Sequence, residues 1–164
     1  MVSISVPEKL YQKLRRSAEA QGISIEGYVL SLIAKSIDPE SLAESYWEAS
    51  EGLLAQAKDE LSKGDLKQAG EKAWGAAALA LKSLAYKRDG LRLSSHRELW
   101  EYVSRLAEET SDEELDRLWR SISSMHVNFY EGCATKKHVE EAIKDVEKFM
   151  GKLKNKDRLR GSTN

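Results

Sequence analysis

The densest group of side chains that could do chemistry lies in the stretch WRSISSMHVNFYE, residues 119–131. Arg120 and His126 stand there with five residues between them, and Asn128 and Tyr130 follow. An imidazole titrates near neutral pH, so His126 could take the proton from a ribose 2′-hydroxyl, while Arg120 could stabilise charge on a phosphate. Asn128 could orient the histidine or hold a phosphate oxygen, and Tyr130 could stack a base. If these residues act together, the chemistry they suit is cleavage of a phosphodiester bond next to a ribose.

The spacing of Arg120 and His126 places them on different sides of a helix. Six positions at about 100° each separate the two side chains by roughly 120° around the axis. His126 then shares the apolar stripe with Trp119 and Phe129, whereas Arg120 falls on the polar side. An alternative interpretation is that His126 is a core or interface histidine and Arg120 is a solvated charge. A two-fold interface could still bring copies of both side chains into one cleft.

The other residues that could hold a metal lack the required spacing. His126, Cys133 and His138 are seven and five positions apart with a glycine between them, which is a poor arrangement for zinc. The chain has no glycine-rich phosphate loop and no serine nucleophile motif. We therefore expect no metal and no cofactor. His96 directly follows a helix-capping serine, which predicts a surface position in the first turn of a helix.

Length and charge limit the kinds of partner. A chain of 164 residues fits one domain, or one domain with a small appendage, and a net charge of −1 gives no overall attraction to nucleic acid. Binding to RNA or DNA would need a local basic patch. A single cysteine excludes an internal disulfide, and no apolar run approaches the ~18 residues of a membrane span. We expect a cytoplasmic protein with no membrane partner, and its many charges and few amides favour a thermophilic source.

Five helices are predicted between residues 38 and 153, because a capping residue precedes each apolar stripe of helical period. The predicted caps are Asp38, Asp65, Ser95, Ser111 and Thr135. The second helix is rich in alanine and glycine, which allow close approach, so we expect it at the centre of a bundle. The predicted fold class is all-α. Residues 154–164 form a basic tail that we expect to be flexible.

Residues 1–37 predict an arm in front of this bundle. Residues 2–6 alternate apolar and polar as a half-buried strand does, and two short helices separated by Gly22 follow. The stretches VPEKLYQKLRRSAEAQGIS and IEGYVLSLIAKSI resemble a ribbon–helix–helix unit, the small dimeric fold of many prokaryotic repressors and antitoxins. That resemblance implies a homodimer in which two strands pair and Ser3 and Ser5 face DNA. The alternative is a dimerisation arm with no DNA role.

The bundle resembles the HEPN domain (higher eukaryotes and prokaryotes nucleotide-binding), most closely its archaeal PaREP branch. The resemblance covers roughly residues 40–152 and is carried by EKAWGAAALALKSLA, LSSHRELWEYVSRLAEE and MHVNFYEGCATKKHVEEAIKDVEKF. It implies a five-helix, up-and-down bundle that usually dimerises. Many members are metal-independent RNases that share an arginine, four to six residues and then a histidine, a motif that Arg120 and His126 match. Others are inactive and bind a partner nucleotidyltransferase or nucleic acid.

Two functions follow from these resemblances. The first is a HEPN-type, nucleic-acid-associated protein that acts as a metal-independent endoribonuclease of a toxin–antitoxin or defence system, with Arg120 and His126 as catalytic residues. The second is a non-catalytic DNA-binding or antitoxin-like regulatory dimer. The run HxNFYE at residues 126–131 is the hallmark of the PaREP branch, and it is compatible with a member that only binds.

Overall fold

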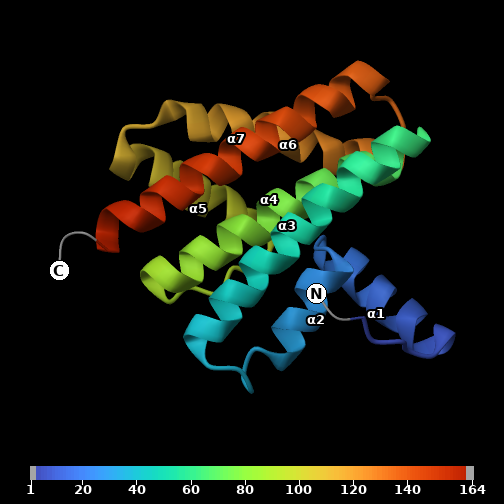
Figure 1. Cartoon of the computed structure of the whole chain (residues 1–164), viewed down its shortest axis with the longest axis horizontal. Helices are drawn as coiled ribbons and strands as arrows, with labels where there is room; N and C mark the ends of the chain where they lie inside the picture. Colours follow the sequence, from blue (N-terminus) through green and yellow to red (C-terminus); the bar gives the residue numbers. More distant parts are fainter. Residues whose placement is uncertain (1–2, 162–164) are drawn as a thin grey trace.

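The structure is all-helical over the residues that it describes. It is a computed structural model that covers residues 3–161, with side chains described as far as residue 157. The helices are α1 (Glu8–Gln21), α2 (Ile25–Ile33), α3 (Pro39–Lys63), α4 (Leu66–Asp89), α5 (His96–Thr110), α6 (Glu113–Glu131) and α7 (Lys136–Gly161) (Figure 1). The prediction of an all-α fold class is therefore confirmed.

The N-terminal segment departs from the predicted fold. The prediction of a strand over residues 2–6 is wrong for residues 3–6, which have no regular secondary structure, and residue 2 lies outside the described residues. A strand is stable only where a second strand completes its backbone hydrogen bonds. Within residues 3–161 every regular element is a helix, so this single chain offers no such partner. Ser3 and Ser5 are exposed on this irregular segment.

Capping side chains begin four of the five predicted bundle helices. Asp38, Asp65 and Ser95 each accept a hydrogen bond of 3.0–3.2 Å from the backbone N–H three residues further on. The side chain of Glu98 in turn accepts a hydrogen bond of 2.9 Å from the backbone N–H of Ser95, which completes a capping box. Thr135 accepts from a backbone N–H of α7 at 3.4 Å. Local side-chain chemistry is thus enough to place these helix starts.

The predicted cap at Ser111 is wrong. Ser111 ends α5 instead, in the left-handed region at a φ of 50°. Asp112 takes the N-cap position of α6 but makes no side-chain cap bond. Its carboxylate accepts from Lys152 Nζ at 3.0 Å and from Lys156 Nζ at 3.1 Å. These bonds tie the α5–α6 turn to α7, and this tertiary interaction takes the place of the local cap.

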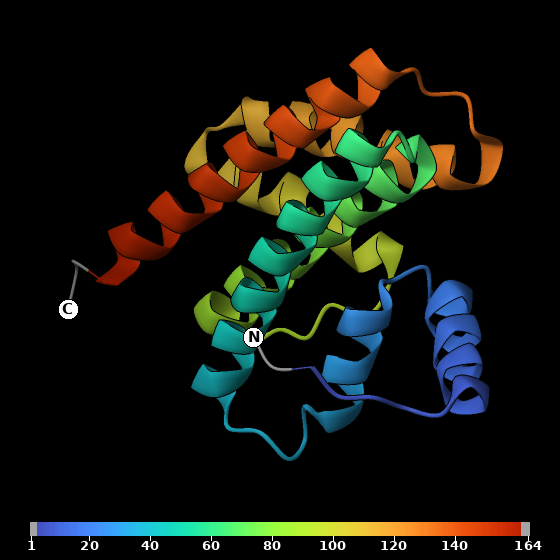
Figure 2. The same cartoon turned by 45° about the vertical axis from the view of Figure 1, so that its right-hand side comes forward.

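The helix α4 lies at the centre of the bundle, as its small side chains predict. It contacts α3, α5, α6 and α7, and every residue from Ala73 to Ala85 is buried. Figures 1 and 2 show α3 and α7 running beside it. Small side chains let neighbouring helices approach, so larger apolar side chains can come from the helices around α4. The largest fully buried side chains include Trp74, Trp119 and Phe149.

The arm, defined here as residues 3–37, packs on the bundle mainly where α2 contacts α3. Figure 2 shows α1 standing at the side of the molecule beside α2. Gly22 joins the two helices in the left-handed region at a φ of 64°, which is strained for residues with a Cβ. Several large apolar side chains of the arm are exposed, and they are called the apolar arm surface below: Ile4, Val6, Leu10, Tyr11, Val29, Leu32 and Ile33.

The last helix extends beyond the predicted end of the bundle. Residues 154–161, which we expected in a flexible tail, continue α7 as far as Gly161, and residues 162–164 lie outside the described residues. Lys156 pairs with Asp112 at 3.1 Å, and Asp157 pairs with Lys87 at 2.8 Å. None of the helices within residues 3–161 has both the length and the apolar character that crossing a bilayer requires.

Candidate functional site

His126 forms a carboxylate–imidazole pair with Glu71. The Nδ1 atom of His126, on α6, lies 2.9 Å from Oε2 and 3.2 Å from Oε1 of Glu71, on α4. The two side chains are largely buried, with exposed fractions of 18% and 21%. An ionised carboxylate can only accept hydrogen bonds, so this pairing favours, for a neutral imidazole, the tautomer with the hydrogen on Nδ1 and a lone pair on Nε2. A histidine held in this tautomer is suited to act as a general base.

Aromatic rings enclose the imidazole of His126. Its ring centroid lies 4.4 Å from that of Trp74, 4.8 Å from His96 and 5.4 Å from Tyr130. Trp74 also stacks on His96 at 5.0 Å, with 14° between the two planes. Trp74 is 1% exposed, and its Nε1 atom has no hydrogen-bond partner among the described residues. The ring of His126 therefore rests on a buried indole and has a second imidazole beside it.

His96 links this cluster to the arm. It is the first residue of α5, and a Cβ added to Gly22 would lie 1.9 Å from its Nε2 atom, so the ring packs directly on the glycine backbone. Burial lowers the pKa of His96 and the nearby His126 lowers it further, whereas a backbone hydrogen bond with Gly22 raises it. The net direction is downward, which favours the neutral ring at neutral pH.

A cavity of about 170 Å³ lies between the arm and the bundle beside His126. Residues of α1 and α2 form one wall, and residues of α4 and α6 form the other. The side chains that could contact a ligand there include Tyr11, Arg15, Glu71, Lys72, His126 and Tyr130. Arg15 pairs with Glu19 at 2.8 Å and Lys72 pairs with Glu26 at 3.3 Å, so the basic groups of the cavity are already neutralised in part.

Arg120 and His126 do not meet within one chain. The Arg120 side chain is 66% exposed and lies 3.4 Å from the carboxylate of Asp116. It lines a different, open cavity between α5 and α6, together with Ser104 and Glu113. This placement agrees with the angle of roughly 120° expected from their spacing on one helix. A shared site for the two residues would require Arg120 from a second copy of the chain.

The other predicted ligand-binding residues lie in different surroundings. Asn128 is 2% exposed, and its Oδ1 atom accepts from the N–H of Ala134 at 2.5 Å, so it holds the connection between α6 and α7. Tyr130 is 54% exposed, lines the cavity and packs edge-on against His126. Burial and the charge of Glu71 raise the pKa of Tyr130. Ser3 and Ser5 stand on the irregular segment before α1.

Three partners of His126 were not foreseen from the sequence. Glu71 and Trp74 lie 55 and 52 positions before it, on a helix whose small residues indicated packing alone. His96 does lie in a first turn as predicted, but its ring is half-buried against Trp74 and not on an open surface. The sequence did offer one indication of a site on α4, which is the charged residue Glu71 among small residues.

A buried lysine lies in the same part of the fold. Lys82, on α4, is 3% exposed. Burial lowers its pKa to about 8, against an opposing effect of Glu98. The charge of Lys82 also contributes to lowering the pKa of His96. Within residues 3–161, no group of three or more His, Cys, Asp and Glu residues is arranged to hold a metal.

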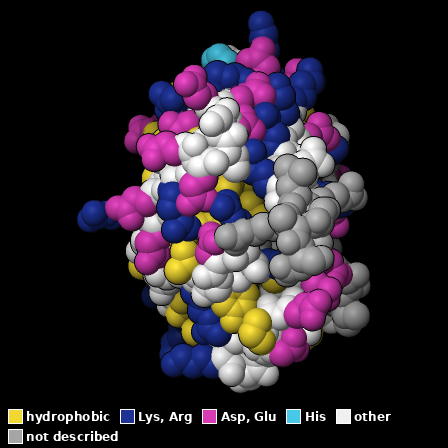
Figure 3. All heavy atoms as spheres, turned by 90° about the vertical axis from the view of Figure 1, so that its left-hand side faces the viewer, with side chains coloured by type: hydrophobic (Ala, Val, Ile, Leu, Met, Phe, Trp, Pro, Cys, Tyr) yellow, Lys and Arg dark blue, Asp and Glu magenta, His cyan; other side chains and the backbone are white. Residues whose placement is uncertain are grey.

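Charge on the surface is mixed. Figure 3 shows one face of the molecule, on which basic and acidic side chains of the described residues are interspersed. Ion pairs of the described residues, such as Lys58–Glu147 and Lys148–Glu114, link neighbouring helices. This face therefore presents charges of both signs.

Comparisons with known proteins agree on the bundle. Residues 45–150 match the model of the archaeal PaREP1/PaREP8 family. A solved crystal structure of a protein from Sulfolobus solfataricus is similar at a TM-score of 0.57 and 30% sequence identity. That similarity covers 65% of this chain and 94% of the other chain. No curated protein matches the sequence.

Proposed function

The chain belongs to the archaeal PaREP1/PaREP8 family, and from this premise we propose that it is a HEPN-type, nucleic-acid-associated protein that cleaves RNA without a metal ion. The observation that carries the proposal is the bond of 2.9 Å between His126 Nδ1 and Glu71 Oε2. The carboxylate fixes the tautomer in which Nε2 accepts a proton, and it stabilises the imidazolium that then forms.

The proposed reaction is an internal transfer at phosphorus. His126 Nε2 takes the proton of a ribose 2′-hydroxyl, and the 2′-oxygen forms a bond to the adjacent phosphorus. The bond from phosphorus to the 5′-oxygen of the next nucleotide breaks, and that oxygen takes a proton from water. The products are a 2′,3′-cyclic phosphate and a free 5′-hydroxyl. Tyr130, exposed at the cavity beside His126, supplies an aromatic face for a base.

Arg120 enters this proposal as the contribution of a second protomer. Its guanidinium is 66% exposed and lines another cavity, so in the same chain it does not face His126. In a two-fold dimer, Arg120 of one protomer would stabilise the phosphate that is attacked through His126 of its partner. Two equivalent composite sites would result.

The test uses the full-length chain with single-stranded and structured RNA substrates in the presence of EDTA. His126→Ala should lower the cleavage rate about 10²- to 10⁴-fold, as removal of a general base does. His138→Ala removes an exposed histidine outside the cavity and should cleave like the parent protein. The proposal would be overturned if the parent protein left RNA intact and His126→Ala only lowered the melting temperature. His126 would then have a packing role.

A mixing experiment tests the composite site. Arg120→Ala and His126→Ala should each be inactive alone, but a refolded mixture should regain activity, because hybrid dimers contain one site with both residues intact. Recovery of about a quarter of the parent activity is expected if dimers form at random. Full activity of Arg120→Ala alone would remove Arg120 from the mechanism. A mixture of two inactive variants that stays inactive would rule out the composite site.

A second candidate function rests on the apolar arm surface. Leu32 and Ile33 are 56% and 43% exposed, which is unusual for adjacent large apolar residues of a helix. A second copy of the chain that covered this surface would form a non-catalytic, DNA-binding or antitoxin-like dimer. Titration with duplex DNA at low and moderate salt separates the two functions. Binding that weakens steeply with salt supports this one, and absence of binding at low salt removes it.

A further inference from the structure

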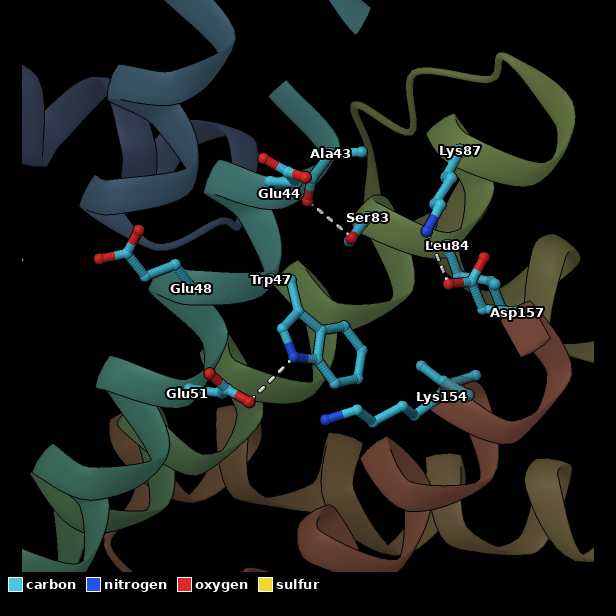
Figure 4. Close-up of a pocket in the computed structure, with 11 residues that line it drawn as sticks. Ala43, Glu44, Trp47, Glu48, Glu51, Ser83, Leu84, Lys87, Lys154 and Asp157 are labelled. Atoms are coloured by element: carbon cyan, nitrogen blue, oxygen red, sulfur yellow. Dashed lines mark hydrogen bonds and ion pairs between the residues drawn. The ribbon is translucent and has the colours of Figure 1, made fainter. Parts of the chain in front are cut away.

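A third cavity, larger than the one beside His126, lies among α3, α4 and α7. It has a volume of about 450 Å³, which is within the usual range for small-molecule sites. Figure 4 shows its walls: Trp47 stands between the side chains of α3 and those of α7, and Lys87 and Asp157 close one end. None of these residues lines the cavity beside His126, so the two cavities are separate.

Trp47 is held in place to present one face of its ring. Its Nε1 atom donates a hydrogen bond of 2.9 Å to Glu51, one turn further along α3. The Nζ atom of Lys154, on α7, lies 5.9 Å from the ring centroid. An ammonium group at this distance from an indole face is attracted by the π-electrons of the ring. The protein's own lysine therefore marks a position that favours a primary ammonium.

The rest of the lining suits a cation with an apolar chain. Four carboxylates, from Glu44, Glu48, Glu51 and Asp157, line the cavity with only two ammonium groups. One of these, on Lys87, is already bound to Asp157 at 2.8 Å. Buried side chains of Leu84 and Leu153 supply apolar wall between the charged groups. The carboxylates would repel an anionic ligand and attract an ammonium group.

We propose that this cavity binds a linear polyamine, a flexible methylene chain with two or more ammonium groups. One ammonium displaces Lys154 from the face of Trp47 and pairs with Glu51. The methylene groups contact Leu84 and Leu153, and a second ammonium pairs with Glu44. This site is independent of the proposed RNA cleavage, because it shares no lining residue with the cavity of His126.

Isothermal titration of the full-length chain with spermidine at low salt tests the proposal. Saturable binding at one site per chain is expected. Trp47→Leu should weaken it about 3- to 30-fold, the loss of one cation–π contact, and Trp47→Phe should fall between. Glu51→Gln removes a carboxylate that pairs with the ligand and should also weaken binding. Two controls should bind like the parent protein: Trp100→Leu, which removes an exposed tryptophan elsewhere, and Glu131→Gln, which makes the same charge change as Glu51→Gln at an exposed position.

Lys154→Gln supplies the decisive comparison. It removes the internal ammonium that occupies the ring face, so spermidine should bind more tightly than to Lys137→Gln, which makes the same change of charge at an exposed position. Melting temperatures of all variants establish that they fold. Equal affinities for the two lysine variants, or unchanged binding by a folded Trp47→Leu or Trp47→Phe, would overturn the proposal and leave only general attraction between a polyamine and an acidic surface.

Discussion

The Nδ1 atom of His126 lies 2.9 Å from Oε2 of Glu71, across 55 positions of the chain. The pair depends on how closely α6 approaches α4. A Cβ added to Gly70, next to Glu71, would lie 3.4 Å from the sulfur of Met125, next to His126. Gly70 thus makes room for Met125, and the pair of Glu71 and His126 forms at the edge of this contact.

Glu71→Gln should slow RNA cleavage and leave the fold in place. Gln can still accept the hydrogen bond from Nδ1, so the ring keeps its orientation, but it no longer offsets the positive charge that forms on the imidazole. We expect a fall of about 10-fold to 100-fold in kcat/KM. Steady-state cleavage assays measure it, and Glu141→Gln, an exposed residue of α7, is the matched control. An undiminished rate would leave Glu71 with a structural role only.

Gly22→Ala should destabilise the protein more than Gly64→Ala does. Both glycines have positive φ, at 64° and 83°, so each change costs about 1–2 kcal/mol of backbone strain. Nothing lies within 4 Å of a Cβ at Gly64, whereas a Cβ at Gly22 would overlap the ring of His96. Overlap adds about 1–3 kcal/mol to the loss at Gly22. Urea unfolding of both variants measures the difference.

The double variant Gly22→Ala/His96→Ala separates strain from overlap. In a protein that already carries His96→Ala, there is no ring for the new Cβ to overlap. Adding Gly22→Ala to it should then lower the free energy of unfolding only by the backbone strain. Equal destabilisation by Gly22→Ala and Gly64→Ala would show that α1 can shift away from α5 without cost, contrary to the close contact at Gly22.

Lys82→Met should stabilise the protein at neutral pH. Burial lowers the pKa of Lys82 from 10.5 to about 8, so the folded state binds fewer protons than the unfolded state between these values. The free energy of unfolding therefore rises with pH from about 8 to 10.5, and below 8 the buried charge costs up to roughly 3 kcal/mol. Methionine has a similar shape and removes that cost.

Thermal unfolding at pH 7 and pH 10 checks this prediction. The gain in Tm of Lys82→Met over the parent protein should be large at pH 7 and smaller at pH 10, where Lys82 is already neutral in the folded state. Lys137→Met, at an exposed position, should show little difference at either pH. A lower Tm for Lys82→Met at pH 7 would mean that the ammonium makes a stabilising contact that outweighs its desolvation.

Leu32→Glu should lower the oligomeric state of the chain. Leu32 is 56% exposed on the apolar arm surface, and a carboxylate there would be buried without a partner if a second copy covered the surface. Light scattering at a fixed protein concentration measures the change. Leu91→Glu places the same charge at a residue that is 40% exposed outside the arm, and should have no effect. A parent protein that is monomeric at high concentration would contradict the dimer.

Local chemistry predicted much of the bundle. Asp38, Asp65 and Ser95 begin helices because a capping bond needs only a residue three positions away. The central place of α4 also follows from its own composition. The prediction failed where a distant group intervened: Asp112 binds two lysines of α7 in place of a local cap, and residues 3–6 lack the second strand that their alternation would need.

The candidate site was predicted only in part, for the same reason. The helical angle between Arg120 and His126 could be calculated from their spacing, and it agrees with their separation into two cavities. Glu71 and His96 could not be assigned to His126, because their contacts join helices whose relative rotation depends on the packing of the whole core. The catalytic roles of Arg120 and His126 stay predictions for the cleavage experiments.

The arm has two sides with different surroundings, one exposed and one lining the cavity beside His126. Leu32 and Ile33 belong to the apolar arm surface, whereas Arg15 and Gly22 line the cavity that contains His126. The two sides are carried by a pair of short helices that touches α5 through the ring of His96. Substitutions in this pair are therefore pleiotropic. A library of arm variants selected for altered assembly would also vary the geometry around His126. Each variant would therefore need one measurement of its oligomeric state and another of the cavity beside His126.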